Sequence, residues 1–308
     1  MLPSDILVIK HGALGDIILA TAGFKAVREA HPDARIVLLT TKAYAGLLAQ
    51  SPYFNEIWVD SKPKFFQREA WKNLKVMLNS RPWAWVYDMQ TSQRTGIYQW
   101  LFKRPWPKMS NAGRFSSHPR PRDKKRQHAL ERLRDQLYVA DLHIGAPDIG
   151  WLTGDISAFT LPQHYALLVP GGAPHRPGKR WPAEQYAALA QELVARGITP
   201  VLIGTHAEET VLQSIATRVP HTINLCGKTT IGQLAELARG ATIAIGNDTG
   251  PMHVIAPTGC PCTVIFSHES DPVRSAPVGN VTVLREQDLS ALSVDRVLVS
   301  LNLTQAGH

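Results

Sequence analysis

Short apolar segments alternate with amphipathic segments in the first half of the chain. Four apolar segments predict buried strands, at residues 6–10 (ILVIK), 35–40 (RIVLLT), 56–59 and 85–88 (WVYD). Between the first two, residues 16–30 have helical spacing that brings Ile17, Ala20 and Phe24 to one side. Strands that alternate with helices predict a parallel sheet with helices on its faces.

The same alternation begins again in the second half. Predicted strands lie at residues 165–169, 199–203, 222–225, 242–245 and 263–266, the last clear one. Predicted helices of this half lie at residues 183–196, 208–218 and 231–239, with a short one from Pro251, whereas a predicted helix at residues 127–140 belongs to the first half. Residues 104–123 show little periodicity, and residues 144–164 are rich in glycine and proline. We therefore expect an α/β protein of two domains, residues 1–150 and 151–308.

A glycine turn follows the first predicted strand, in the sequence Lys10-His-Gly-Ala-Leu-Gly-Asp16. Its glycines, Gly12 and Gly15, have the spacing GxxG, which differs from the GxGxxG of dinucleotide-binding proteins. Asp16 begins the next helix and allows two interpretations. It is either a carboxylate favoured by the helix dipole or a base that accepts a proton from a substrate hydroxyl.

Polar and charged residues follow three strands of the second half. Lys179 lies in a glycine-rich loop and suits a phosphate oxygen, whereas Glu208 suits ribose hydroxyls or a helix N-terminus. Asp248 and His253 flank Pro251, which we expect at the first position of a helix. That helix end predicts a diphosphate site, and the alternative is an ordinary capped helix. Ligands of such folds bind at these strand ends.

Length and composition agree with two folded domains. The 308 residues are 44% hydrophobic and 19% charged, and no apolar run reaches the roughly 18 residues that span a bilayer. The first residues do not resemble a signal peptide, since charged residues interrupt the apolar segment. Three cysteines without a CxxC pair favour a reducing compartment over a disulfide framework or a zinc site. We expect a cytoplasmic protein.

Most of the excess positive charge is local. The formal charge is +8, and residues 114–134 alone hold eight lysines and arginines against Asp123 and Glu131, a net charge of +6. Such a concentration predicts an anionic partner, and the alternative is a solvated basic loop and helix. The cations that we single out as candidate binding residues are Arg120, Arg122, Lys124, Lys125 and Arg126.

Several of these segments, in matching order over roughly residues 5–280, resemble one family. They read KHGALGDIILATAGFKAV, PGG…GKRWPAEQY, IGTHAEE, LCGKTTIGQLAEL, GNDTGPMH and a later SDP. The chain thereby resembles the ADP-heptose:lipopolysaccharide heptosyltransferases, glycosyltransferase family nine. The resemblance implies the GT-B fold, in which the parallel sheets of two Rossmann-like domains lie on either side of a central cleft. It implies an acceptor-binding first domain and a donor-binding second domain.

The resemblance also implies residue roles. Asp16 matches the catalytic base. From the residues themselves we expect Gly12, Gly15 and the cations of residues 120–126 on the acceptor side. The implied donor-binding residues are Lys179, Glu208, Asp248, Thr249, Gly250 and His253. Family members invert the sugar configuration and need no metal, so we expect no cofactor.

The implied partners are a nucleotide-sugar donor, an ADP-linked heptose, and an anionic lipid-linked saccharide acceptor. We therefore expect cytoplasmic location with possible peripheral contact at the cytoplasmic face of the inner membrane, and no nucleic-acid partner.

Two alternatives remain open from the sequence. A GT-B nucleotide-sugar epimerase that acts on UDP-N-acetylglucosamine would use a similar donor domain but leaves the basic stretch unexplained. A nucleic-acid-binding protein would explain that stretch, although it lacks interleaved aromatic residues and leaves the donor-type loops unused.

Overall fold

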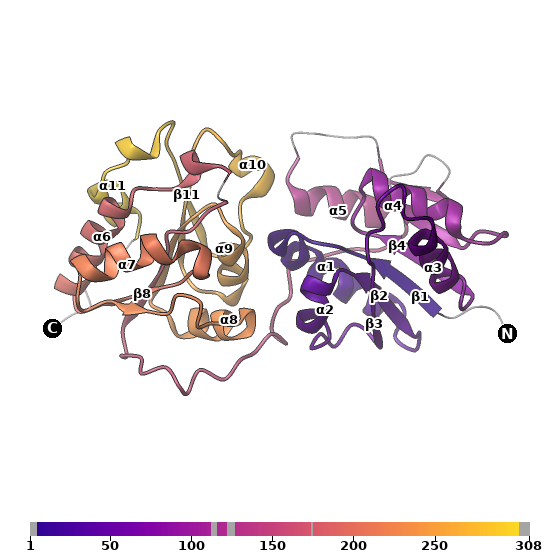
Figure 1. The fold of residues 1–308 in the computed structure, drawn as a ribbon, viewed down its shortest axis with the longest axis horizontal. Coiled ribbons are helices and arrows are strands. Elements are labelled where there is room, and N and C mark those ends of the chain that lie inside the picture. The colour runs from indigo at the N-terminus through magenta and orange to yellow at the C-terminus, as the bar shows by residue number, and fades with distance from the viewer. Residues whose placement is uncertain (1–4, 112–115, 122–126, 174, 302–308) are drawn as a thin grey trace. The chain divides into compact units, whose positions relative to one another are not determined.

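The structure, a computed structural model, describes residues 5–111, 116–121, 127–173 and 175–301. The chain divides into two compact units, of which the first ends at Trp151 and the second begins at Leu152 (Figure 1). The division lies within residues 144–164, where the described chain forms no helix or strand. Each unit is a parallel sheet with helices around it, so the predicted α/β class is confirmed.

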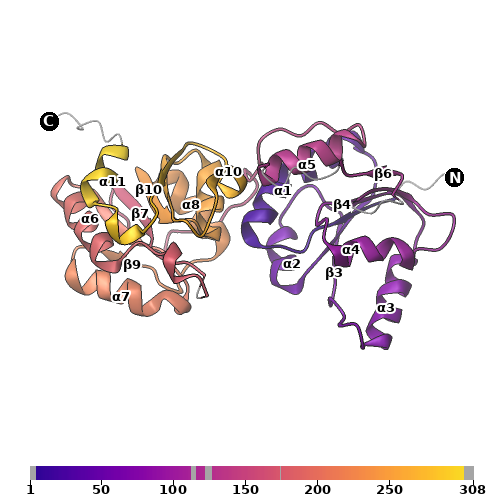
Figure 2. The same ribbon diagram turned by 90° about the horizontal axis from the view of Figure 1, so that it is seen from above.

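The first unit contains a six-stranded parallel sheet in the order β3-β2-β1-β4-β5-β6. Its strands are β1 (Asp5–Ile9), β2 (Ile36–Thr40), β3 (Glu56–Val59), β4 (Trp83–Asp88), β5 (Lys108–Asn111) and β6 (His118–Pro119). Its helices are α1 (Leu14–Ala30), α2 (Lys42–Leu48), α3 (Arg68–Leu78), α4 (Gln93–Tyr98), the 3-10 turn η1 (Gln99–Leu101) and α5 (Ala129–Tyr138). Helices α1 and α5 lie side by side (Figure 2). Leu7 and Ile9 of β1 pack in one core cluster with Leu74 of α3 and Tyr98 of α4.

The second unit repeats this plan with the strand order β12-β11-β10-β7-β8-β9. Its strands are β7 (Tyr165–Val169), β8 (Thr199–Leu202), β9 (Ile223–Asn224), β10 (Ile243–Asn247), β11 (Cys262–Phe266) and β12 (Val281–Arg285). Its helices are α6 (Ala183–Ala195), α7 (Glu209–Arg218), α8 (Ile231–Gly240), α9 (Gly250–Ile255), α10 (Pro272–Ser275) and α11 (Val294–Ser300). Short 3-10 turns are η2 (Pro177–Lys179), η3 (His206–Glu208), η4 (Ala256–Thr258) and η5 (Leu289–Ala291).

The structure corrects the sequence prediction at three places. Strands β5 and β6 occupy part of residues 104–123, where no regular element was expected, because they are short and rich in prolines and polar residues. Strand β12 and helix α11 follow the strand expected to be the last; β12 is an edge strand with several exposed residues, so its apolar signal is weak. Helix α9 begins at Gly250, so Pro251 takes its second position, not its first.

No described helix has the length and apolar character that crossing a membrane requires. The three cysteines are free, and Cys260 and Cys262 are buried at the start of β11. Both side chains therefore act as small apolar groups in the packing.

Trp181 joins the loop before α6 to the core of the second unit. Its side chain is 1% exposed, lies edge-on to the ring of Tyr186, and donates from Nε1 to the Leu292 carbonyl oxygen at 2.9 Å. A buried tryptophan with a satisfied N–H contributes both apolar burial and a hydrogen bond. The loop that carries Lys179 therefore depends on this side chain for its position.

We expect Trp181→Ala to lower the unfolding free energy of the second unit by about 3–5 kcal/mol, because it leaves a large cavity. Denaturant unfolding followed by circular dichroism measures this change. The matched control is Trp100→Ala in the first unit, where the side chain is 53% exposed, with an expected change of less than about 1 kcal/mol. Equal changes in the two variants would contradict the anchoring role of Trp181.

Candidate functional site

The glycine turn after β1 has a conformation that requires glycine at position 12. Gly12 has a φ of +123°, and a Cβ there would lie 2.4 Å from Cε2 of Tyr44. Any other residue would be strained by both the dihedral and the ring. Gly15 lies in the first turn of α1. The geometry thus explains Gly12 as a turn residue, and acceptor contact by either glycine stays a prediction.

Asp16 is the third residue of α1 and is exposed. The helix begins after Ala13, which has no side chain that can cap it. A carboxylate in the first turn is favoured by the helix dipole, so the structural interpretation of Asp16 is satisfied. Whether Asp16 can also act as a base depends on the residues around it.

Asp16 lines a polar pocket of about 310 Å³ within the first unit. The pocket also contains Lys10 from the loop after β1, Arg120 from the segment after β6, and Arg132 and Gln136 from α5. The structure therefore brings together two residues that the sequence had suggested separately, Asp16 and Arg120. A carboxylate beside three cations suits a ligand that carries both a hydroxyl and an anionic group.

Lys10 is a pocket residue that the sequence analysis did not single out. Its side chain is buried and donates from Nζ to the Met89 carbonyl oxygen at 3.2 Å. Burial lowers the pKa of Lys10, and the carboxylates of Asp16 and Asp88 oppose that shift. Burial also raises the pKa of Asp88, which lies at the end of β4. The only available sequence signal was a lysine at the end of an apolar strand.

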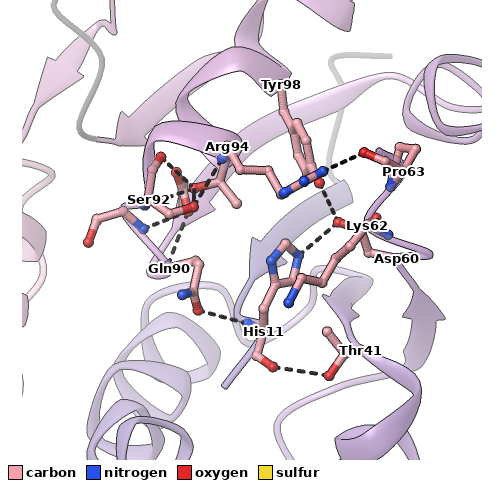
Figure 3. A network of polar contacts seen from close by, with 12 residues as sticks. His11, Thr41, Asp60, Lys62, Pro63, Gln90, Ser92, Arg94 and Tyr98 are labelled. Atoms are coloured by element: carbon pink, nitrogen blue, oxygen red, sulfur yellow. Dashed lines mark hydrogen bonds and ion pairs between the residues drawn. The ribbon is translucent and has the colours of Figure 1, made fainter. Parts of the chain in front are cut away.

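Beside this pocket, a buried polar network holds the glycine turn in place (Figure 3). His11 Nε2 lies 2.9 Å from Oδ2 of Asp60, and the Tyr98 hydroxyl donates to the same oxygen at 2.5 Å. The backbone N–H of His11 donates to Oε1 of Gln90, and Thr41 Oγ1 donates to the His11 carbonyl oxygen. The loops after β1, β2, β3 and β4 are thus tied together next to Asp16.

Asp60 is the centre of this network and is fully enclosed. Burial alone would raise the pKa of Asp60, but contacts from His11 and Tyr98 and a hydrogen bond from the Lys62 N–H outweigh it and leave the pKa below its ordinary value. The charged carboxylate is therefore the form that the folded first unit favours.

The remaining predicted acceptor residues, Arg122, Lys124, Lys125 and Arg126, lie outside the described residues. Arg120, the first cation of that group, is described and donates from Nη1 to Oγ1 of Thr91 at 3.2 Å. This contact ties the basic stretch to the loop after β4.

In the second unit, Lys179 and Asp248 form an ion pair at the carboxyl ends of the strands. Lys179 Nζ lies 2.6 Å from Oδ2 of Asp248, and the two side chains are 12% and 7% exposed. The structure therefore brings together two of the predicted donor residues. Glu269, which follows β11, lies against the same loop, since a Cβ on Gly178 would come within 2.7 Å of its Oε1.

Asn247 fastens these loops and was not predicted as a functional residue. Its side chain is fully buried, and its Oδ1 accepts from the backbone N–H of Trp181 and from the Tyr186 hydroxyl, both at 3.1 Å. Its Nδ2 donates to the carbonyl oxygens of Pro170 and Gly171. One amide thus connects the loops after β7 and β10 next to Lys179, a constraint that no local pattern reveals.

The other predicted donor residues lie along the same edge of the sheet. Glu208 accepts from the Thr205 N–H at 2.8 Å in a capping box, and a Cβ on Gly171 would contact its side chain. Thr249 precedes α9, which begins at Gly250, and His253 is buried in that helix. The capping box accounts for Glu208 structurally, so its contact with a ribose stays a prediction.

Comparison with known proteins identifies a common family. A model of glycosyltransferase family 9 (heptosyltransferase) matches residues 116–295. Lipopolysaccharide core heptosyltransferase OpsX of Haemophilus influenzae is 24% identical over 301 residues, which cover 91% of this chain and 83% of that protein. Lipooligosaccharide heptosyltransferase 2 of the same species is 32% identical over 120 residues, 37% of this chain and 34% of that protein.

Solved structures share the fold. The structure of E. coli ADP-heptose lipopolysaccharide heptosyltransferase II matches with a TM-score of 0.76 at 22% identity, and the match covers 97% of both chains. Two parallel six-stranded sheets and this match support the GT-B fold class expected from the sequence.

We expect Asp60→Asn to lower the stability of the first unit by about 1–3 kcal/mol at about pH 7, because it removes a buried charged acceptor. Since the pKa of Asp60 is lowered on folding, its stabilisation is present above the ordinary carboxyl pKa of about 4 and is lost as pH falls through the folded pKa. Thermal unfolding at about pH 7 and about pH 3 should therefore show a difference between variant and wild type that shrinks in acid. Asp33→Asn, at an exposed position of the same unit, is the control. A difference of equal size at both pH values would contradict the role of the Asp60 charge.

Proposed function

The chain belongs to glycosyltransferase family 9 (heptosyltransferase), and we propose that it transfers a heptose from an ADP-sugar to a saccharide acceptor of the lipopolysaccharide core. The observation that carries the proposal is the family match over residues 116–295. The relatives support the substrate class, since they are named as lipopolysaccharide and lipooligosaccharide heptosyltransferases. This assignment favours transfer over the epimerase and nucleic-acid alternatives.

In this proposal the first unit binds the acceptor and supplies the base. The acceptor hydroxyl lies near Asp16 in the polar pocket, and an anionic group of the acceptor pairs with Arg120 and Arg132. Arginine suits carboxylates and phosphates because its planar guanidinium donates two parallel hydrogen bonds. Lys10 adds a third, buried cation to the same pocket.

The second unit binds the donor. Lys179 offers a cation to the donor diphosphate, next to Asp248, Thr249 and the start of α9. Glu208 lies in the turn that follows β8. Nucleotides bind at the carboxyl ends of the strands in such folds, and this turn follows one of those ends. Asn247 and Trp181 fix the loops that carry these residues.

The proposed reaction is a single in-line displacement that inverts the anomeric carbon. The acceptor oxygen forms a bond to that carbon as its proton moves to Asp16, while the bond from the carbon to the diphosphate breaks and ADP leaves. Charge builds up on the leaving diphosphate, and Lys179 would stabilise it without a metal ion. The second unit thus supplies charge stabilisation and the first supplies general-base catalysis.

A lipid-linked acceptor implies where the reaction occurs. We propose that the protein works in the cytoplasm at the inner face of the inner membrane, because its acceptor is anchored there. Peripheral contact through cations is consistent with the net charge of +8.

Asp16→Asn tests the proposed base. We expect the rate of transfer to fall by about 10²–10⁴-fold with the affinity for ADP unchanged, because the amide cannot accept the proton. Mass spectrometry of the acceptor measures transfer, and calorimetry measures ADP binding. Glu29→Gln, at an exposed carboxylate on the same helix, should leave both unchanged. Transfer at the wild-type rate in Asp16→Asn would exclude this residue as the base.

Arg132→Gln tests the acceptor side of the pocket. We expect the KM for the acceptor to rise by about tenfold while ADP affinity stays the same, because one charged hydrogen bond to the acceptor is lost. Arg134→Gln is the matched control, since Arg134 lies on the same helix but pairs with Glu131. A parallel loss of donor and acceptor affinity in Arg132→Gln would count against an acceptor site in the pocket.

A further inference from the structure

The loop after β3 exposes two adjacent phenylalanines. Phe65 is 96% exposed and Phe66 is 74% exposed. They occupy the two central positions of a turn that is closed by a hydrogen bond from the Gln67 N–H to the Lys64 carbonyl oxygen at 2.9 Å. Such positions usually hold glycine, proline, asparagine or aspartate. Two large apolar side chains at the tip of a turn indicate a surface that contacts an apolar partner.

This turn has a defined conformation. Lys64 N–H donates to Oε1 of Gln67 at 2.7 Å, and Nε1 of Trp71 donates to the Lys64 carbonyl oxygen. At the base of the loop, Arg94 donates to the Pro63 carbonyl oxygen at 2.8 Å, beside the Asp60 network (Figure 3). The exposure of the two phenylalanines is therefore a property of an anchored turn.

The turn lies on the same sheet edge as Asp16. Strands β1, β2 and β3 pair in parallel, so the loops that follow them meet at their carboxyl ends. The contact between His11 and Asp60 joins the loop of the phenylalanines directly to the glycine turn. A partner that binds the two phenylalanines therefore lies at the edge of the sheet that also carries the proposed base.

Positive charge surrounds the two phenylalanines. Lys62, Lys64 and Arg68 are exposed. The flanking acidic residues are Asp60, which is buried, and Glu69, which is exposed and pairs with Lys72. Lys64 Nζ lies 6.0 Å from the ring centre of Phe66. Aromatic side chains flanked by lysine and arginine are the combination that binds the interface of a bilayer with anionic headgroups.

A second aromatic surface of the first unit lies at the opposite edge of the sheet. It is a groove of about 710 Å³ before β4 and β5, where Arg104 stacks over Trp106, and Trp106 contacts Trp100. The groove lies at the amino ends of the strands, whereas Asp16 lies beyond the carboxyl end of β1. A substitution beside this groove is therefore a control for membrane binding by the exposed turn.

We propose that the Lys64–Gln67 turn inserts Phe65 and Phe66 into an anionic bilayer, with Lys62, Lys64 and Arg68 at the headgroups, and so presents a lipid-linked acceptor to the edge of Asp16. The insertion itself requires only the exposed turn; its purpose rests on the proposed function. It places membrane contact on residues 62–68.

Vesicle binding by the full chain tests the proposal. The protein is sedimented with vesicles of phosphatidylglycerol and phosphatidylcholine, or of phosphatidylcholine alone. We expect binding to the anionic vesicles that weakens with salt, and a loss of about tenfold or more in the double variant Phe65→Ser/Phe66→Ser. The double variant Phe65→Trp/Phe66→Trp should bind as wild type does, and so should Trp100→Ser, at a side chain that contacts Trp106 beside the groove.

A transfer assay separates this proposal from the proposed function. With a delipidated core acceptor, the serine double variant should react at the wild-type rate, whereas it should react more slowly with the same acceptor in vesicles. Failure of the wild type to bind anionic vesicles, unchanged binding in the serine variant, or a larger loss in Trp100→Ser would overturn the proposal. An equal loss of transfer with both acceptors would assign the turn to the saccharide and overturn it too. If wild-type protein transfers no sugar to the delipidated acceptor, the proposed function fails, whatever the vesicles show.

Discussion

Parallel strand pairing is the constraint on which the candidate sites depend. Every crossover in a parallel sheet returns the chain to the same end, so the loops after all strands gather at one edge. In the first unit this edge brings Lys10 and Asp16, from the turn after β1, together with Gln90, which follows β4 and is distant from them in the sequence. In the second unit it collects Lys179 and Asp248. Each group of chemically competent residues exists because its strands pair in this way.

Gathering loops at one edge does not by itself fix their conformations, and each unit uses a buried polar side chain to do so. Asp60 accepts contacts from His11 and Tyr98 in the first unit. Asn247 joins the loops after β7 and β10 to Trp181 in the second. Such groups are costly to bury unless every polar atom has a partner, so they favour one arrangement of the loops. The residues that fix the sites are thus distinct from those that we propose to act on substrate.

The sequence predicted strands β1 to β4 and β7 to β11, because buried parallel strands are continuous apolar runs that the order of residues reveals. Helices α2, α3 and α4 of the first unit were not predicted. The sequence also singled out Asp16, Lys179 and Asp248 as candidate site residues, because each lies in a segment that follows a predicted strand. It did not reveal the burial of Lys10 or the contact between His11 and Asp60, which are 49 positions apart. Periodicity reports on local structure, and such contacts arise only when the sheet has formed. The edge strand β12 was missed for a related reason, because its exposure removes the apolar signal.

Transfer of a heptose from an ADP-sugar to a lipopolysaccharide core acceptor is the reaction that we propose for the chain. It is tested by incubating the protein with ADP-L-glycero-D-manno-heptose and a panel of delipidated core acceptors and following both products by mass spectrometry. We expect one acceptor to gain a single heptose for each ADP released. Acceptors that stay unmodified while the donor remains intact, or transfer from a UDP-sugar in place of the ADP-sugar, would contradict it.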